Sequence, residues 1–172
     1  MQPFGLKRKA MLLVTIEQRY TDYLRQFDNR VSINIDNTYV RPYIGVLFRV
    51  QEKEYFAPLT SSRKGKKLKD NPKPESTTFF PIDNCNLGGI NLNNMIPVVA
   101  AVYTSFDITN EPNLTKKTFL QKQVVFLRKK EAYIIAKAKK LYNLKISGKL
   151  YPNYDAITCD FKLLEEKASL FK

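Results

Sequence analysis

Short apolar runs with β-branched residues dominate the first two thirds of the chain, and one helical pattern interrupts them near the start. The run MLLVTI at residues 11–16 predicts a buried strand. Across 17–28 apolar side chains recur every three or four residues and predict an amphipathic helix. The residues of this apolar face are Ile16, Tyr20, Tyr23, Leu24 and Phe27.

Further strands follow with turn-forming residues between them. Residues 43–51 (YIGVLFRVQ) and 54–59 (EYFAPL) predict a hairpin that turns at Glu52 and Lys53. Residues 60–76 are rich in Lys, Ser, Pro and Gly and predict a loop. The remaining predicted strands are 77–82, 88–92 and 97–108.

The pattern becomes helical after the turn TNEPN, where Asn113 is a suitable N-cap. Helical spacing continues from 113 to 145, with a break at 129–131 that predicts two helices, and a last helix is predicted at 161–171. The predicted fold class is therefore α+β, an antiparallel sheet carrying packed helices. One domain is expected over residues 1–172, with 1–10 as a basic extension and Met11 as an alternative start.

Composition narrows the classes of function. No apolar run reaches the roughly 18 residues of a membrane span, and the start lacks a signal-peptide pattern, so we expect a cytoplasmic protein. Cys85 and Cys159 fit neither a disulfide framework nor a zinc site and are interpreted as reduced packing residues. The chain has no histidine, so catalysis must proceed without the commonest general base and metal ligand. We expect no metal site and no cofactor.

Charge points to a polyanionic partner. The chain has 29 Lys and Arg against 16 Asp and Glu, a net charge of +13, which suggests binding to nucleic acid or to an anionic membrane surface. Residues 113–145 hold ten cations and only the acid Glu131. A solvated helix face is the simpler interpretation, but such faces normally mix both signs. We therefore include Lys116, Lys117, Lys129 and Lys130 as RNA-binding candidates.

The stretch YFAPLTSSRKGKKLK at 55–69 sets three hydroxyls beside five cations. It lacks the order of a nucleotide-hydrolase phosphate loop, and no histidine is present to activate a serine nucleophile. Thr60 and Ser61 can instead hydrogen-bond a phosphate while Arg63 and Lys64 neutralise its charge, although a plain basic surface loop fits the residues equally well. Lys66, Lys67 and Lys69 are further candidates for RNA binding.

If that phosphate belongs to RNA, cleavage needs neither a metal nor an attacking water. The neighbouring 2′-OH displaces the 5′-oxygen and leaves a cyclic phosphate, while the protein aligns the atoms and stabilises the charge on phosphorus. Lysine or tyrosine can move the protons, and a lysine crowded by other cations has a lowered pKa. DNA cannot be cut by this route.

Several stretches resemble one family, the toxin nucleases of type III toxin–antitoxin systems, the ToxN/AbiQ group. The resembling strings, which cover nearly everything from Met11 onward, are YTDYLRQFD (20–28), RPYIGVLF (41–48), YFAPLTS (55–61), GGINLNNMIPV (88–98), FLQKQVVFLRK (119–129) and FKLLEEK (161–167). The resemblance implies a metal-independent endoribonuclease on a compact, strongly bent, barrel-like sheet similar to the Kid/MazF toxins. It also implies inhibition by a small, repeated, pseudoknotted RNA antitoxin and a role in aborting phage infection.

The resemblance also implies roles for individual residues. It places Thr60, Ser61 and Arg63 in the active site, although Lys64 can take the role of Arg63 because this chain has T-S-S-R-K where family members often have T-S-P-K. Tyr20 and Arg41 match further catalytic positions, and Tyr39 lies near Arg41 as an RNA-binding candidate.

Plainer interpretations stand beside these roles. Without the family, Tyr20 is a packed core tyrosine and Arg41 a solvated cation at a strand entry. GGINLNNMIPV predicts a strand and turn with small residues for close backbone approach, without chemistry of its own. LLEEK predicts a packed helix with two exposed acids.

The leading hypothesis is an endoribonuclease toxin with RNA as substrate and RNA as antitoxin. The alternative is a non-catalytic RNA-binding module, for which the same basic surface suffices. A DNA-binding regulator ranks third, because no clear helix-turn-helix pattern is present.

Overall fold

The computed structural model describes residues 11–36 and 39–172, apart from the side chains of residues 35, 36 and 39. Twelve strands are assigned in this part of the chain: β1 Leu12–Ile16, β2 Ile35–Asp36, β3 Tyr39–Val40, β4 Tyr43–Gly45, β5 Arg49–Val50, β6 Lys53–Thr60, β7 Ser62–Arg63, β8 Lys66–Lys67, β9 Phe79–Pro81, β10 Gly89–Asn91, β11 Ile96–Val98 and β12 Tyr103–Ser105. The α-helices are α1 Gln18–Arg25, α2 Leu114–Lys129, α3 Glu131–Ile146, α4 Pro152–Ile157 and α5 Phe161–Leu170, and 3₁₀ turns occupy η1 Leu92–Asn94 and η2 Ala100–Val102.

A single antiparallel sheet is built around β6. Its strand order is β12-β1-β4-β6-β10-β9, and β5 and β11 also pair with β6. Seven of the eight residues of β6 are buried, and the eighth is Thr60 at its end. The predicted α+β class is confirmed. Within the described residues β12 and β9 do not pair, so the sheet is not a closed barrel, and similarity to the Kid/MazF toxins remains a prediction.

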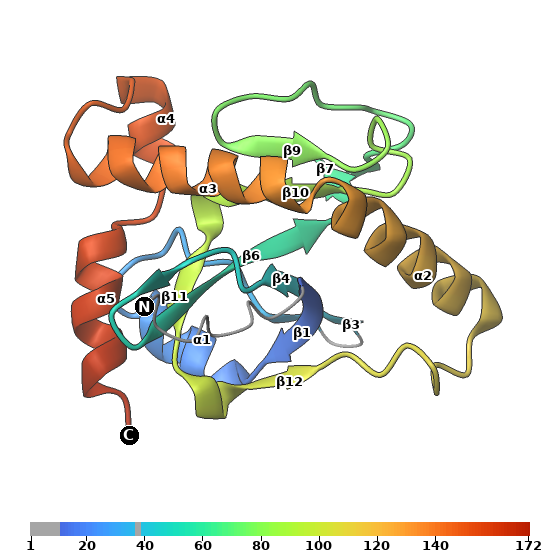
Figure 1. Cartoon of the computed structure of the whole chain (residues 1–172), viewed down its shortest axis with the longest axis horizontal. Helices are drawn as coiled ribbons and strands as arrows, with labels where there is room; N and C mark the ends of the chain where they lie inside the picture. The colour runs from blue at the N-terminus through green and yellow to red at the C-terminus, as the bar shows by residue number, and fades with distance from the viewer. Residues whose placement is uncertain (1–10, 37–38) are drawn as a thin grey trace, which may run out of the picture.

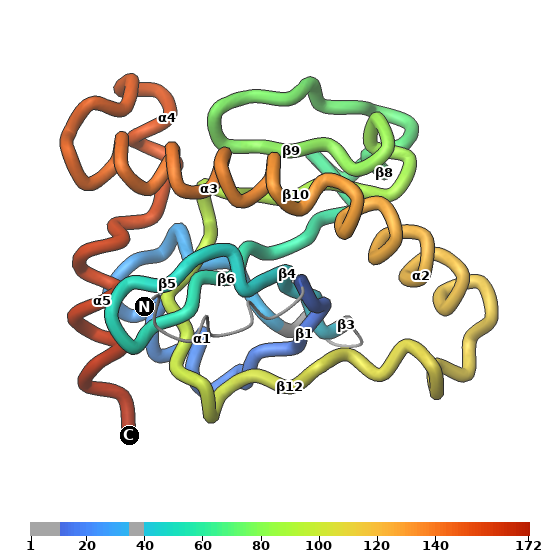
Figure 2. The backbone as a smooth tube through the Cα atoms, in the orientation of Figure 1, coloured from blue at the N-terminus to red at the C-terminus, as the bar shows by residue number. Residues whose placement is uncertain are grey.

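The helices cover one side and one end of this sheet (Figure 1). The tube in Figure 2 shows α3 running across the sheet and α2 meeting it at an angle near β10, with the other end of α2 joined to the segment that follows β12. α5 packs on β11, α1 and α3. The main core joins both layers, with Tyr55, Phe56, Ile134, Leu141 and Phe161 among its fully or almost fully buried members.

The predicted helices are confirmed, with one addition. Asn113 caps α2 by accepting a hydrogen bond from the Lys116 N–H at 3.0 Å, and the break falls at Lys130, whose φ of −102° and ψ of 9° leave the helical region. The short helix α4 was not predicted, because six residues carry too little periodicity; its signal is Pro152 at the first helical position.

Two predicted long strands are interrupted. The strand predicted at 43–51 divides into β4 and β5. Tyr43 pairs with Pro58 and Arg49 with Glu54, so an advance of six residues from β4 to β5 corresponds to an advance of only four along β6. The two extra residues bulge out of the ladder. The strand predicted at 97–108 is wrong over its middle, because η2 carries the chain from β11 on one sheet edge to β12 beside β1.

Of the two acids in LLEEK that were predicted to be exposed, Glu166 is exposed as expected, with 66% of its side chain accessible, but Glu165 is not. The side chain of Glu165 is only 12% exposed, and its Oε1 accepts hydrogen bonds from the hydroxyls of Tyr55 (2.8 Å) and Tyr142 (2.6 Å). A buried carboxylate needs such donors. Glu165 therefore ties α5 to β6 and α3.

Candidate functional site

The end of β6 presents the Thr60–Ser62 hydroxyls in three different settings. The Thr60 hydroxyl donates to the Ser62 carbonyl at 3.0 Å and so closes a small turn. Ser61 is exposed and lines a cavity, and its hydroxyl has no hydrogen-bond partner among the described residues. Ser62 is exposed outside that cavity. Of the three, Ser61 is thus the hydroxyl available to a ligand in the cavity.

Part of the predicted loop 60–76 is a small anchored hairpin. β7 and β8 pair with Ser62 opposite Lys67 and Arg63 opposite Lys66, and Lys64 and Gly65 form the turn with positive φ values of 50° and 75°. The backbone N–H of Leu68 donates to the Ser61 carbonyl at 2.8 Å, and the Leu68 side chain is buried with Phe79 and Cys85. The hairpin that carries the cations of the loop is therefore held against the rest of the fold by this hydrogen bond and by the packing of Leu68.

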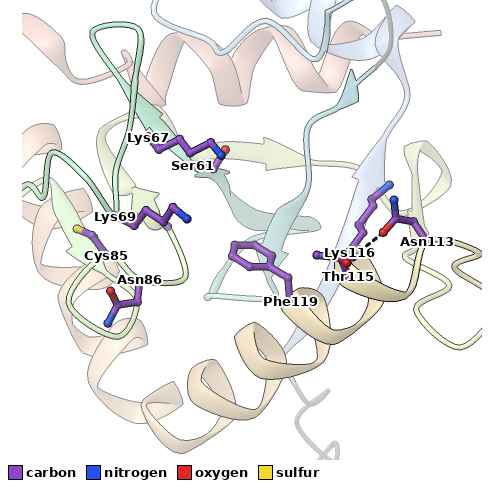
Figure 3. A pocket seen from close by; sticks show the side chains of 10 residues that line it. Ser61, Lys67, Lys69, Cys85, Asn86, Asn113, Thr115, Lys116 and Phe119 are labelled. Atoms are coloured by element: carbon purple, nitrogen blue, oxygen red, sulfur yellow. Dashed lines mark hydrogen bonds between the residues drawn. The ribbon is translucent and has the colours of Figure 1, made fainter.

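A cavity of about 490 Å³ lies between this hairpin, the loop before β10 and the start of α2 (Figure 3). Its lining residues include three lysines and no acid: Ser61, Lys67, Lys69, Cys85, Asn86, Gly88, Asn113, Thr115, Lys116 and Phe119. The cavity brings together three of the predicted RNA-binding lysines and Ser61. Such a lining favours an anionic ligand.

The glycine pair of GGINLNNMIPV lies beside the cavity, and Gly88 is one of its lining residues. Gly88 has a φ of +85°, and a Cβ there would lie 2.5 Å from the Thr60 carbonyl oxygen; a Cβ at Gly89 would lie 2.2 Å from the Phe79 ring. Gly88 therefore allows the backbone before β10 to approach the end of β6 beside the Thr60–Ser61 turn, and Gly89 leaves room for the Phe79 ring of β9. The expectation of close backbone approach is confirmed at Gly88.

Arg41 is hydrogen-bonded to the backbone of β6 just before the turn at Thr60–Ser62. Its guanidinium donates from Nη1 to the Leu59 carbonyl at 3.0 Å and from Nε to the Ile33 carbonyl at 3.0 Å. Because the Leu59 N–H donates to the Pro42 carbonyl, Arg41 stands beside the residue before Thr60. Arg41 is half-buried, so it is not simply a solvated cation at a strand entry.

Tyr20 lies apart from the cavity, in the core. Its side chain is fully buried, its hydroxyl donates to the Pro97 carbonyl at 2.5 Å, and its ring meets Phe171 edge-on. Burial raises the pKa of the Tyr20 hydroxyl, and Tyr23 adds to this effect. The side chain of Tyr39, in β3, lies outside the described residues.

Arg63 and Lys64 do not line the cavity. Arg63 is half-buried, whereas Lys64 is exposed at the hairpin tip. Lys73 was missed from the sequence: its ammonium group lies 4.6 Å from the centre of the Phe79 ring. Burial lowers the pKa of Lys73, and the nearby charge of Arg63 lowers it further. The main cause is thus burial rather than crowding by cations, and Lys73 is not among the residues that line the cavity.

The one-signed character of residues 113–145 is partly compensated from outside the segment. Three of its lysines form ion pairs: Lys116 with Glu111 (3.2 Å), Lys137 with Glu75 (3.4 Å) and Lys145 with Asp155 (2.8 Å). The other cations have no ion pair among the described residues: Lys117, Lys122, Arg128, Lys129, Lys130, Lys139 and Lys140. Three of these seven cations, Arg128, Lys129 and Lys130, lie at the junction of α2 and α3, and the other four are spread along the two helices.

Two further observations concern chemistry that the sequence addressed. Among the side chains that the structure describes, no three from Cys, Asp or Glu gather closely enough to hold a metal ion. Cys85 and Cys159 are both free and buried, as expected of packing residues, and burial raises the pKa of the Cys159 thiol to about 12. In the same part of the chain, no helix has the length and apolar character needed to cross a membrane.

The fold is that of a toxin family. The model of the family "Toxin ToxN, type III toxin-antitoxin system" matches residues 12–169, so the chain belongs to this family. The resemblance drawn from the sequence strings is confirmed.

Individual relatives match over most of their length. The chain is 38% identical to the endoribonuclease ToxN of Pectobacterium atrosepticum, covering 91% of each protein. It is 33% identical to the endoribonuclease ToxN of Bacillus thuringiensis subsp. kurstaki (92% of this chain, 82% of that one). It is 31% identical to the endoribonuclease AbiQ of Lactococcus lactis (95% and 91%).

Solved structures agree with this assignment. One concerns a processed non-coding RNA that regulates a bacterial antiviral system, with a TM-score of 0.79 at 36% identity over 93% of this chain and 98% of that one. Another concerns selective toxin inhibition by a non-coding RNA pseudoknot, with a TM-score of 0.79 at 31% identity over 94% and 98%.

Proposed function

We propose that this chain is the endoribonuclease toxin of a type III toxin–antitoxin system that aborts phage infection. It would cut RNA without a metal, by attack of the 2′-OH and formation of a 2′,3′-cyclic phosphate. The observation that carries the proposal is the free Ser61 hydroxyl in a cavity whose charged lining residues are all lysines. The names of the three relatives, all endoribonucleases, support it.

The proposed catalytic residues have separate roles, which the geometry supports for Ser61, Thr60 and Arg41. Ser61 donates to a non-bridging oxygen of the scissile phosphate, and Thr60 fixes the turn through its bond to the Ser62 carbonyl. Arg41 holds the same backbone through the Leu59 carbonyl. Arg63, with Lys64 as the alternative, stabilises the charge that develops on phosphorus, and Lys66, Lys67 and Lys69 hold neighbouring phosphates.

Residues away from the cavity complete the proposal. Lys116, Lys117, Lys129, Lys130 and Tyr39 bind RNA, including a small repeated antitoxin that folds as a pseudoknot. The chain acts in the cytoplasm as one domain with residues 1–10 as an extension, and its bent sheet is related to that of the Kid/MazF toxins. The named relatives and the RNA pseudoknot of a structural neighbour support the partner.

The test is incubation of the purified protein with single-stranded RNA in EDTA, beside an all-DNA oligonucleotide of the same sequence. Cleavage of RNA alone, with cyclic phosphate on the products, is the expected result. RNA that is bound but intact in EDTA and also with added Mg²⁺ would favour the non-catalytic RNA-binding module. Cleavage of DNA, or products with 3′-hydroxyl ends, would contradict the 2′-OH route.

Replacing Tyr20 with phenylalanine separates a catalytic role from a structural one. Because the hydroxyl is buried and bonded to the Pro97 carbonyl, its loss should reduce the free energy of unfolding by roughly 1–3 kcal/mol and leave the cleavage rate of the folded protein within about twofold. Urea denaturation and single-turnover cleavage measure the two effects. A hundredfold slower reaction in a fully folded Tyr20→Phe protein would show that this hydroxyl reaches the RNA.

Reversing Lys129 and Lys130 to glutamate should weaken RNA binding and flatten its dependence on salt. Each lost phosphate contact lowers the slope of log K against log salt by about 0.7 for single strands, so a change of about 1 to 2 is expected. The matched control is Arg19→Glu with Lys172→Glu, which changes net charge equally near α1 and the C-terminus. Equal slopes for the two double variants would remove Lys129 and Lys130 from the interface.

A further inference from the structure

Phe119 is an aromatic side chain of α2 for which the described fold provides no packing role. It is half-buried, but it belongs neither to the main core nor to the side chains packed against it. None of the aromatic pairs among the described residues includes its ring. Instead the ring lines the same cavity as Ser61, and Figure 3 shows it between the Lys69 side and the Lys116 side.

The surroundings of the ring fit one kind of ligand. Lys67, Lys69 and Lys116 supply positive charge and no acid lines the cavity, which suits a phosphate-bearing ligand. A flat apolar ring among these cations suits a ligand that also carries a planar aromatic group. The side-chain amides of Asn86 and Asn113 stand at the edges, where they can bond polar groups of a base.

We propose that this cavity is a nucleotide subsite, in which Phe119 stacks on a base of single-stranded RNA immediately beside the phosphate held at Ser61. The polymer and its scissile phosphate are taken from the proposed function; the stacking surface is a separate claim about binding. A base fixed in this way sets the position of its own sugar and phosphate, and so contributes to alignment of the 2′-OH for attack.

Phe119 also lines a second hollow next to the cavity. In the proposed subsite, the RNA strand continues into this hollow. This hollow of about 620 Å³ shares Asn86, Thr115 and Phe119 with the first. Its other lining residues are the cation Lys122, the acid Asp83, Leu87, Leu114 and Thr118. Lys122 lies one turn after Phe119 on α2, on the same helix face. The ring thus separates two adjacent spaces, and Lys122 is placed to meet the next phosphate along the strand.

The experiment is a cycle of protein and RNA changes. The cut is first mapped in a short RNA, which is then labelled and protected by a single 2′-deoxynucleotide at the cut. Its affinity is measured by fluorescence anisotropy with the wild type, Phe119→Ala and Phe119→Trp, using intact RNA and RNAs with one abasic residue at each position near the cut. Val125→Ala, which removes an exposed apolar side chain of the same helix that lines neither hollow, is the matched control.

With intact RNA, Phe119→Ala is expected to lower the affinity by about tenfold or more. In the Phe119→Ala protein, removal of the one base that stacks on Phe119 should cause no further loss of affinity. Phe119→Trp should restore the affinity. An equal loss for intact and abasic RNA, or a loss no larger than that of Val125→Ala, would overturn the subsite. If Phe119→Ala does not fold, Phe119→Leu replaces it, because leucine keeps apolar volume without a stacking surface.

The two proposals fail in different ways. If the wild type cuts no RNA, the proposed function fails, but the cycle still runs on an unmodified RNA with the abasic position moved along its length. Base-dependent binding through Phe119 in that case would support the subsite alone. Cleavage with normal product ends but without any coupling between Phe119 and a base would support the nuclease and refute the subsite.

Discussion

Replacing Ser61 with alanine is expected to slow RNA cleavage by about 10²–10³-fold while RNA binding changes by less than about fivefold. The hydroxyl is exposed and has no internal partner in the part of the chain that the structure describes, so its removal should not destabilise the fold. Its proposed bond to the phosphate strengthens as negative charge builds on the non-bridging oxygens. The loss should therefore appear in the single-turnover rate rather than in affinity.

Ser62→Ala is the control for this experiment, because it removes a neighbouring exposed hydroxyl that lines neither the cavity nor the core. Thr60→Val gives a third, distinct expectation: it breaks the bond to the Ser62 carbonyl and should slow cleavage through a displaced turn, with partial rescue by Thr60→Ser. Equal rates for Ser61→Ala and Ser62→Ala would show that the hydroxyl at 61 takes no part in the reaction.

Elements whose signals lie in neighbouring residues were predictable from the sequence, whereas the interruptions of the two long strands were not. Asn113 caps α2 and Lys130 breaks the helical segment, because a capping side chain and a lapse in apolar spacing are properties of neighbouring residues. The bulge between β4 and β5 depends on how β6 pairs along both of its edges. Such pairing brings together residues that no short window contains.

Long-range polar contacts also explain the errors in charge and burial. The lysines of 113–145 lacked acids within their own segment, yet Glu75, Glu111 and Asp155 reach three of them from elsewhere in the chain. Glu165 was expected at the surface because LLEEK ends in charged residues. Its carboxylate instead accepts hydrogen bonds from the hydroxyls of Tyr55 and Tyr142, which lie 110 and 23 residues away in the sequence. Hydropathy cannot reveal such partners.

The site was predicted in part for a similar reason. Ser61 and the lysines of its loop are close in sequence, so their combination was visible. Phe119 lies off the apolar stripe of Leu120, Val124 and Leu127, and an aromatic between cations at i−3 and i+3 was the available signal. Its position opposite Ser61 depends on how α2 meets the loop before β10, which the hydrogen bond from Gln123 to the Leu87 carbonyl secures at 2.8 Å.

Replacing Asp28 with alanine is expected to reduce the free energy of unfolding by about 3 kcal/mol. The side chain is only 2% exposed, and its carboxylate accepts four hydrogen bonds: from Arg30 N (3.0 Å), Arg30 Nε (2.8 Å), Arg30 Nη2 (3.1 Å) and Asp160 N (2.7 Å). Asp160 caps α5, and the Arg30 carbonyl accepts from Asn94 in η1. The carboxylate thus joins the segment after α1 to the start of α5, and it holds Arg30, whose backbone contacts η1.

The pH dependence distinguishes this network from simple loss of packing. Burial raises the pKa of Asp28, but the hydrogen bonds from Arg30 and Asp160 outweigh it and leave the pKa below its usual value. A carboxylate with a lowered pKa stabilises the fold fully above its unfolded pKa of about 3.9, and this contribution disappears as the pH falls through the folded pKa. The difference in unfolding free energy between the wild type and Asp28→Ala, measured by urea denaturation, should therefore be constant near neutral pH and shrink below about pH 4.

Asp155→Ala is the control, because it breaks a pair whose carboxylate is 50% exposed and should change stability by less than about 1 kcal/mol. A similarly small effect for Asp28→Ala would mean that the four hydrogen bonds do not hold α1 and α5 together.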